Sequence, residues 1–333
     1  MLLLSGCGSR INGELPISPS STNELTSVVP LPAETRTSSP VDTVTPPAPV
    51  PGIGSLLRSD KDGAALVYVP EGEFLMGSSD EPCDTCKGSP SYLDNKPQHT
   101  VRLNAFWIDQ TEVTNKLYSL CVSAGACTPP ASIASPTRSS YYSNPKFDLY
   151  PVVNIEWDQA SQYCSWAGRR LPTEAEWEKA ARGENGYAYP WGNDPPNDRL
   201  LNYNSPSRDT TEVGHYPDGQ SPYGAYDMAG NVWEWVNDRY DENYYQVSPA
   251  VNPLGPDSDL QKSNSRVLRG GSWYYADGSF RSIFRFGVVP VDYLVRSDVR
   301  SWALQKYEET SIYGRSTYGL GTVGFRCAMD ANP

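Results

Sequence analysis

Apolar positions recur with a helical period in three segments of the chain. We expect one helix over residues 111–124 and a second over residues 157–167, where apolar side chains follow the i, i+3, i+4, i+7 spacing of one buried face. The apolar positions of that face are Ala160, Tyr163, Cys164 and Ala167. The third helix begins at a capping box, in which Glu176 follows Thr173 by three residues, and it ends at Gly183.

Strand patterns are shorter and less regular. Residues 66–70 and 72–77 predict two short strands with a turn between them, and residues 101–108 alternate apolar and polar positions as one strand does. After residue 186 the long helical patterns stop, and proline, glycine, asparagine and aspartate separate short aromatic-rich stretches. We therefore predict an α+β domain over residues 64–330 that has little regular secondary structure and is held together by turns and buried tryptophans.

The segment before this domain has a different composition. Residues 8–60 are dominated by serine, threonine and proline, and no hydrophobic period organises them. Such a segment cannot bury enough apolar surface to offset the entropy lost on ordering. We predict that it is a disordered tether.

Residues 1–7 resemble the end of a bacterial lipoprotein signal. Leu4-Ser5-Gly6-Cys7 has the form of a lipobox, in which the cysteine becomes the acylated first residue. The apolar stretch before it is shorter than the usual h-region of about 7–15 residues, so we expect the native start codon to lie upstream. The alternative is a chance cysteine after a few leucines. No other apolar run approaches the ~20 residues of a spanning helix, so we expect attachment to the membrane only through a lipid anchor, at the extracellular face of the cell membrane or in the periplasm.

The net charge and the histidine content exclude some classes of function. The formal net charge of −12 leaves no basic excess to neutralise phosphates, which argues against a nucleic-acid partner. The 22 tyrosines and nine tryptophans suit a secreted, loop-rich binding surface. Two histidines, His99 and His215, severely limit histidine-based catalysis.

If Cys7 is acylated, six cysteines remain, and an even number in an exported chain indicates disulfides. A zinc site built from the first four thiolates is one alternative, although the C-x5-C spacing of its second half is loose. A redox-active C-x-x-C is another, although no βαβ pattern surrounds Cys83. The six cysteines fall as Cys83 and Cys86, Cys121 and Cys127, and Cys164 and Cys327.

A series of motifs spans nearly everything after the tether. The motifs are Val69–Gly72, Phe74–Gly77, Glu112–Asn115, Pro151–Val153, Tyr163–Gly168, Leu171–Glu178, Tyr189–Gly192, Gly230–Trp235, Arg266–Trp273 and Gly324–Cys327. In this order they resemble the formylglycine-generating enzyme (sulfatase-modifying factor) family. The resemblance implies a variant of the C-type-lectin fold and a structural disulfide between Cys164 and Cys327. Seven tryptophans inside or beside these motifs are expected in the core: Trp157, Trp166, Trp177, Trp191, Trp233, Trp235 and Trp273.

The resemblance also identifies where the family oxidase holds Cu(I), which requires soft thiolate ligands. Counted from the Gly-Gly-Ser-Trp motif, the two thiolate positions are Tyr275 and Phe280, and no cysteine lies between Cys164 and Cys327 to replace them. We therefore expect no copper and doubt the oxidase activity. The sulfoxide synthases of the same superfamily use three histidines on an added helical domain, and this chain has neither.

Family members carry two structural calcium ions, and the resemblance implies two sets of oxygen ligands here. The alternative is that the carboxylates of both sets cap turns without a metal. The first set is Asp227, Gly230, Val232 and Glu234; the second is Asn202, Tyr203, Asp209 and Thr211.

Residues 274–320 combine aromatic side chains with serine, glycine, aspartate and arginine, and no strand or helix period organises them. That composition is typical of a recognition surface. The segment also looks like the variable region of C-type-lectin-fold proteins that retroelements diversify. The alternative is that its aromatic residues simply cover the core. The residues expected to contact a ligand are Tyr274, Tyr275, Phe280, Arg281, Phe284 and Phe286.

These inferences favour an exported, lipid-anchored binding protein without catalytic activity, whose partner is an unknown peptide, glycan or surface protein. A formylglycine-generating oxidoreductase and a scaffold in an envelope complex are the alternatives.

Overall fold

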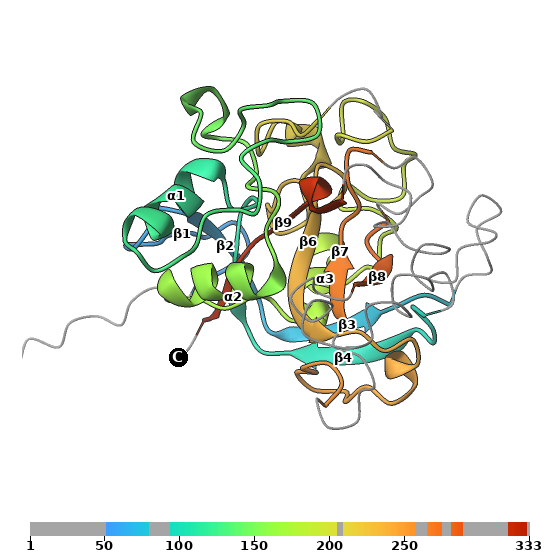
Figure 1. Ribbon diagram of the computed structural model, residues 1–333. Helices are drawn as coiled ribbons and strands as arrows, with labels where there is room; N and C mark the ends of the chain where they lie inside the picture. Colours follow the sequence, from blue (N-terminus) through green and yellow to red (C-terminus); the bar gives the residue numbers. More distant parts are fainter. Residues whose placement is uncertain are drawn as a thin grey trace, which may run out of the picture. The chain divides into compact units, whose positions relative to one another are not determined.

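The computed structural model describes residues 51–79, 94–204, 209–257, 265–274, 281–288 and 319–331, and every element below comes from these ranges (Figure 1). Within them, no helix has both the length and the apolar character needed to cross a membrane. Several residues with predicted roles lie outside the described ranges: Cys7, Cys83, Cys86, Tyr275 and Phe280.

The described strands form two four-stranded sheets and one two-stranded sheet. The first sheet is antiparallel, in the order β1 (Leu56–Arg58), β2 (Ala65–Val69), β5 (Phe106–Asp109) and β10 (Ala328–Asp330). The two-stranded sheet pairs β3 (Gly72–Met76) with β4 (His99–Leu103). The third has the order β8 (Arg285–Val288), β7 (Arg266–Arg269), β6 (Trp233–Arg239) and β9 (Val323–Phe325).

Three α-helices lie where the hydrophobic period places them. They are α1 (Asn115–Ser123), α2 (Trp157–Trp166) and α3 (Glu174–Arg182). Helix α3 begins at the predicted capping box, because the Thr173 side chain accepts from the Glu176 backbone N–H while the Glu176 carboxylate accepts from the Thr173 N–H. It ends at Gly183, whose φ of 67° favours glycine. Short 3-10 turns occupy Pro145–Phe147, Pro217–Gly219, Tyr244–Gln246 and Gly319–Thr322.

Two sequence boundaries change in the structure. The single strand expected over residues 101–108 is wrong: β4 and β5 belong to different sheets, and the chain turns between them at Asn104, whose backbone N–H donates to Asn252 Oδ1 over 2.8 Å. The apolar alternation runs from Val101 to Ala105 and so passes through this turn, and the period alone does not locate it. Strand β1 lies within residues 8–60, which the composition assigned to the tether, and its antiparallel pairing with β2 places it in the domain.

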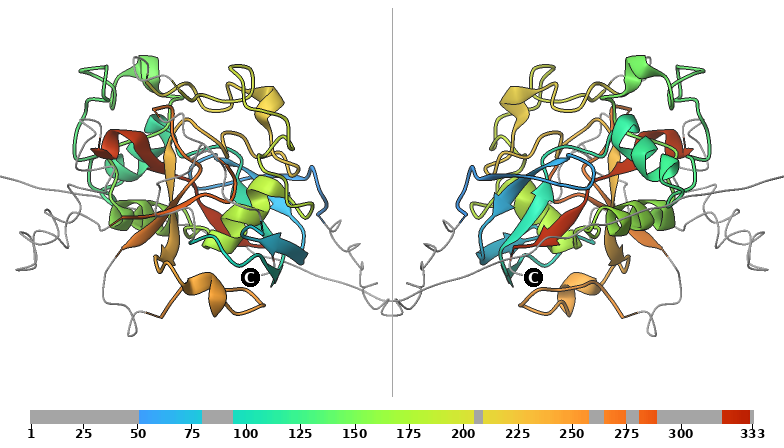
Figure 2. Two further views of the ribbon diagram at one scale, coloured as in Figure 1. Left: turned by 90° about the vertical axis from the view of Figure 1, so that its right-hand side faces the viewer. Right: turned by 90° about the vertical axis from the view of Figure 1, so that its left-hand side faces the viewer.

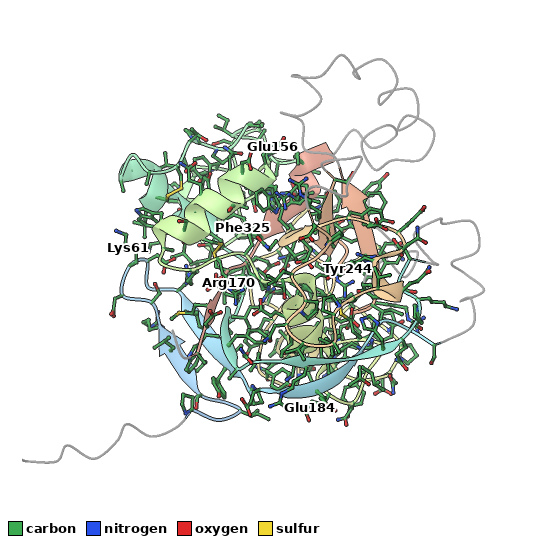
Figure 3. All side chains as sticks on the ribbon, turned by 90° about the horizontal axis from the view of Figure 1, so that it is seen from below. Lys61, Glu156, Arg170, Glu184, Tyr244 and Phe325 are labelled. Carbon is green, nitrogen blue, oxygen red and sulfur yellow. A yellow bond between two sulfur atoms is a disulfide. The ribbon has the colours of Figure 1, made fainter. Side chains whose placement is uncertain are left out.

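Helix α3 is buried on every side. All of its residues have little exposed surface, although six of the nine are charged or tryptophan. It packs against β3 and β4 on one side and against β6 and β7 on the other, and Figure 2 shows it between the blue and the orange strands. Side chains fill the interior, Phe325 among them, whereas Lys61 and Glu184 lie at the periphery (Figure 3).

The tryptophans divide by burial. Trp177, Trp233, Trp235 and Trp273 are fully buried, as expected of core residues. The remaining three are only partly buried and pack at the edge of the core clusters: Trp157, Trp166 and Trp191.

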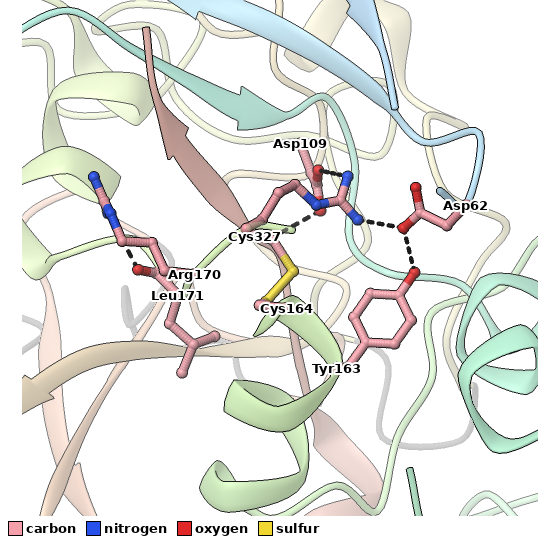
Figure 4. The surroundings of a disulfide bond; sticks show 8 residues. Asp62, Asp109, Tyr163, Cys164, Arg170, Leu171 and Cys327 are labelled. Carbon is pink, nitrogen blue, oxygen red and sulfur yellow. Dashed lines mark hydrogen bonds and ion pairs between the residues drawn. A yellow bond between two sulfur atoms is a disulfide. The ribbon is translucent and has the colours of Figure 1, made fainter. Parts of the chain in front are cut away.

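Two disulfides join the cysteines that the structure describes. Cys164 on α2 pairs with Cys327, as predicted, and Cys121 pairs with Cys127. The second bond removes two of the four thiolates of the alternative zinc site, so that interpretation is wrong. Beside Cys164 and Cys327, Asp109 accepts from the Cys327 backbone N–H over 2.9 Å and from Arg169 over 2.8 Å (Figure 4).

The two disulfides close loops of very different length, 163 and 6 residues. Replacing both Cys164 and Cys327 with alanine is expected to lower the free energy of unfolding by ~5 kcal/mol, because the larger loop restricts the unfolded chain more. The matched replacement of Cys121 and Cys127 is expected to cost only ~2 kcal/mol. Urea denaturation of both variants measures the difference, and equal losses would contradict this account.

Candidate functional site

Two glycines bring the motifs of the third sheet into contact. The Gly230 N–H donates to the Gly270 carbonyl over 2.9 Å, and φ is 76° and 93° at the two residues. A Cβ on Gly230 would lie 2.4 Å from the Asn202 carbonyl oxygen, and one on Gly270 would lie 3.2 Å from the Trp177 ring. Glycine is therefore required at Gly230. The hydrogen bond between Gly230 and Gly270 joins the loop before β6 to the loop after β7.

Buried charges hold the segment before β8 in place. The Arg269 guanidinium donates to Glu174 over 3.1 Å and to Glu178 over 2.6 Å, and its Nη2 also donates to the Ser282 carbonyl over 2.7 Å. Burial raises the pKa of Glu178, but Arg269 and Arg182 outweigh this effect and leave that pKa below its usual value. The backbone at residue 282 is thus fixed to helix α3 through a fully buried arginine.

Arg285 on β8 extends the same network. Its Nε and Nη2 each donate to one oxygen of Glu174 over 2.8 Å, which makes a bidentate pair. Its Nη1 donates to the Asp94 and Asp241 carbonyls over 3.0 and 2.9 Å. One face of β8 therefore points into the charged interior beside α3.

The other face of β8 carries two of the predicted ligand residues. Phe284, which precedes the strand, and Phe286 both pack on the Trp233 ring, with centroid distances of 5.9 and 6.1 Å. Both are partly buried against the cluster that contains α1 and α2. These two aromatic side chains thus cover the core, which is the alternative that the sequence left open for them.

Arg281 lies elsewhere, in a cavity of about 380 Å³ between the 186–196 loop and the segment that precedes β8. The Ser282 N–H donates to the Ala188 carbonyl over 3.0 Å and joins the two walls. Tyr189, a lining residue without a role in the sequence analysis, stacks on Trp191 with centroids 5.0 Å apart. The structure therefore separates Arg281 from Phe284 and Phe286. Tyr274 contacts Trp273 edge-on at 5.7 Å.

The first predicted calcium set lies around the start of β6. Asp227 has a φ of 56°, and its Oδ2 accepts from the Gly214 N–H over 2.6 Å. Glu234 Oε2 accepts from Trp177 Nε1 and Arg326 Nε, while Oε1 accepts from Arg326 Nη2 over 2.7 Å. A carboxylate oxygen has two lone pairs, so Glu234 Oε1 keeps acceptor capacity.

Glu112, which lies in the Glu112–Asn115 motif and has no predicted role, faces Asp227. Its Oε1 accepts from Asn231 Nδ2 over 2.9 Å, whereas its Oε2 is buried without a hydrogen-bond partner. Burial and then the Asp227 charge raise the pKa of Glu112 well above its usual value, and burial also raises the pKa of Asp227. Two buried carboxylates in contact need a shared proton or a cation between them.

The second predicted set is occupied by protein donors. Asp209 Oδ2 accepts from the Ser135 hydroxyl over 2.5 Å and from the Thr137 N–H and hydroxyl over 3.1 and 2.9 Å. Its Oδ1 accepts from the Thr210 N–H over 2.7 Å. Asn202 Nδ2 donates to the Asp209 carbonyl over 3.0 Å, so the two residues are adjacent. In this arrangement the Asp209 carboxylate ties the 135–138 loop and does not point to a free site.

Across the described ranges, no group of three or more histidine, cysteine, aspartate or glutamate side chains could hold a metal ion. A cation near Asp227 would therefore depend on backbone carbonyl oxygens as well as on carboxylates, which is the kind of oxygen-rich set that Ca²⁺ accepts. The orphaned oxygen of Glu112 fits a cation, and the engaged carboxylate of Asp209 does not.

A glycine-braced, disulfide-linked α+β domain of this kind is the C-type-lectin-like variant found in formylglycine-generating enzymes. The family model described as "Sulfatase-modifying factor enzyme 1-like domain" matches residues 55–331, and the chain belongs to this family. The chain is 32% identical to the formylglycine-generating enzyme of Streptomyces coelicolor, and the match covers 85% of this chain and 93% of the relative. It is 34% identical to inactive C-alpha-formylglycine-generating enzyme 2 of Mus musculus, and that match covers 65% of this chain and 76% of the relative.

Solved structures show the same fold at lower identity. PvdO from Pseudomonas aeruginosa aligns with a TM-score of 0.63 at 22% identity and covers 84% of this chain and 100% of its own. Treponema denticola variable protein 1 aligns with a TM-score of 0.58 at 21% identity and covers 83% of this chain and 98% of its own. The predicted family and fold class are thereby confirmed.

Asp94, beside the Arg285 network, provides a test of its electrostatics. Its Oδ2 accepts from the Tyr240 hydroxyl over 2.5 Å, and burial raises its pKa from 3.8 to about 7. The native state therefore holds a proton that the unfolded chain has lost, so this residue's contribution to stability falls as pH rises from about 4 to about 7.

We expect the free energy of unfolding of the native chain, relative to Asp94→Asn, to fall by roughly 1.4 kcal/mol per pH unit within that window. Urea denaturation from pH 4 to pH 8 measures it. Asp218→Asn is the matched control, because it removes a carboxylate from an exposed pair with Arg199, which contributes little to stability. Parallel curves for the native chain and Asp94→Asn would contradict the raised pKa.

Proposed function

We propose that this chain is a non-catalytic binding domain of the sulfatase-modifying factor family, exported and held at the membrane by an acylated Cys7. The proposal rests on the lack of cysteine thiolates at the positions that hold copper in the family oxidase. The four cysteines of the described ranges are all in disulfides, and the sequence has no cysteine between Cys164 and Cys327. The two positions that correspond to the copper ligands of the family oxidase are Tyr275 and Phe280, and neither side chain supplies a thiolate.

The site supports binding in other ways. Arg281 and Ile283, in the segment before β8, line the cavity, and Arg269, which pairs with Glu174 and Glu178, donates to the Ser282 carbonyl in its wall. Residues 275–280 and 289–318, which contain most of the predicted recognition segment, lie outside the described ranges. Their role as a contact surface, and its diversification, stay predictions from composition.

One relative favours catalysis instead. The Streptomyces coelicolor protein carries the name of the oxidase and aligns along 85% of this chain. The Mus musculus relative, by contrast, is named as inactive. A third possibility, a scaffold in an envelope complex, would be favoured if envelope proteins co-purify and no small ligand is found.

We expect no formylglycine when the full chain is incubated with Cu(I), oxygen and a Cys-x-Pro-x-Arg peptide, because the thiolates that hold Cu(I) are missing. Mass spectrometry of the peptide measures conversion of cysteine to the aldehyde. The Streptomyces coelicolor enzyme is the positive control, and the peptide without protein is the background. Conversion above background would overturn the binding proposal and favour the oxidase.

A structural calcium ion is part of the proposal. Asp227, Glu234 Oε1 and the Gly230 and Val232 carbonyls would hold it, and the carboxylate of Glu112, beside Asp227, would add negative charge next to the ion. The ion would neutralise the buried Glu112–Asp227 pair and brace the loop before β6. Asp209 already accepts four hydrogen bonds, so the second set is the weaker candidate.

Calcium at about 100 times its Kd is expected to add ~2.7 kcal/mol to the free energy of unfolding, because it binds only the folded chain. Thermal melts with and without EDTA measure the shift. Glu112→Gln is expected to weaken the response, whereas Asp218→Asn, which alters an exposed carboxylate, should keep it. An unchanged melting temperature after chelation would count against the calcium site.

A further inference from the structure

The cavity beside Arg281 has one arginine whose charge the described protein does not balance. Arg182, on its inner wall, uses Nε and both Nη atoms: it pairs with Glu178 over 3.0 Å and donates to three backbone carbonyls. Arg281 differs, because its guanidinium has no ion pair or hydrogen bond with another residue of the described ranges. Its Nε is buried without a partner.

We infer that this cavity binds the terminal carboxylate of a peptide whose last side chain is apolar. The inference rests on the proposed binding function and names the chemistry of the ligand. A buried donor that lacks an acceptor costs free energy, and an oxyanion removes this cost with a charge-assisted hydrogen bond. The planar fork of arginine matches the two oxygens of a carboxylate.

The other polar groups of the lining favour an acceptor over a hydroxyl-rich ligand. The Gly186 carbonyl accepts from Arg182, and the Ala188 carbonyl accepts from the Ser282 N–H. Asn193 Oδ1 accepts from the Ala188 N–H over 3.0 Å. Because each of these oxygens already accepts one hydrogen bond, a sugar hydroxyl would have to share its acceptor with a protein donor. A carboxylate makes no such demand, since it only accepts.

The rest of the lining is apolar or aromatic. Ile283 follows Ser282, and Ala188 accepts the Ser282 hydrogen bond from the facing loop, which also contributes Tyr189, Pro195 and Pro196. A volume of about 380 Å³ lies within the size range of small-ligand sites. An apolar side chain next to the carboxylate would therefore be in contact with protein on more than one side.

The site is held in shape before any ligand arrives. Arg269 donates a hydrogen bond to the Ser282 carbonyl, and the Phe284 N–H donates to the Arg281 carbonyl over 2.9 Å. The Ser282 N–H ties this segment to the loop that carries Tyr189. A preorganised wall lowers the entropy lost on binding. The protein's net charge of −12 also means that a general attraction for anions is absent, so a preference for an acid must come from a local cation.

The test compares acetyl-Ala-Phe carrying a free carboxylate with the same dipeptide as its amide, by titration calorimetry on the full chain. We expect the acid to bind tighter than the amide by roughly ten- to a hundredfold, the range of a charge-assisted hydrogen bond. Arg281→Met should abolish this preference while it keeps the apolar stem, and Arg281→Lys should retain part of it. Arg199→Met is the matched control, because it removes the same charge from a side chain that is 83% exposed.

Equal affinity of the native chain for acid and amide, or no binding of either, would overturn the inference. Tight binding of glucuronic acid without binding of the dipeptide would replace the peptide with an acidic saccharide and also overturn it. Thermal melts establish that each variant is folded. The aldehyde assay, run on the same samples, separates the two failures: turnover defeats the binding function itself, whereas a lost acid preference without turnover defeats only the carboxylate assignment.

Discussion

The pairing of Arg269 with Glu174 and Glu178 is the interaction on which the rest of this structure depends. All three side chains are almost completely buried, so removal of any one would leave an uncompensated charge in the interior. The same guanidinium donates to the Ser282 carbonyl, which joins helix α3 to β7 and to the segment before β8. One buried cation therefore fixes the helix, the sheet and the wall of the cavity together.

This arrangement gives β8 two faces with different tasks. Arg285 points toward Glu174 and completes the charge balance of the interior, whereas Phe286 points toward Trp233 and completes an apolar cluster. Both contacts are made within the described residues of α3, β6 and β8. One fold can carry different chemistries, so the fold of this chain does not by itself establish an activity.

Much of the site could be predicted from the sequence. The sequence did not show that the predicted ligand residues lie in two different surroundings. The family motifs predicted the Cys164–Cys327 disulfide, and the composition of residues 274–320 predicted Arg281 as a ligand residue. Composition also grouped Phe284 with Arg281, although the two side chains lie in different surroundings. In a strand, neighbouring side chains point to opposite faces. An irregular aromatic-rich segment has no period that predicts which face each side chain will occupy. Glu112 was missed because its partner Asp227 lies more than a hundred residues later.

The sequence by itself determined the helices, the capping box of α3, the disulfide cysteines and the family, because each rests on local spacing or on motifs in order. Only the tertiary structure decided where β4 ends and β5 begins, which charges neutralise one another, and that Arg281 has no carboxylate partner among the described residues. The physical reason is that burial and charge compensation are set by residues far apart in the chain. A pattern along the sequence states which residues are charged, and the fold decides which of them are paired.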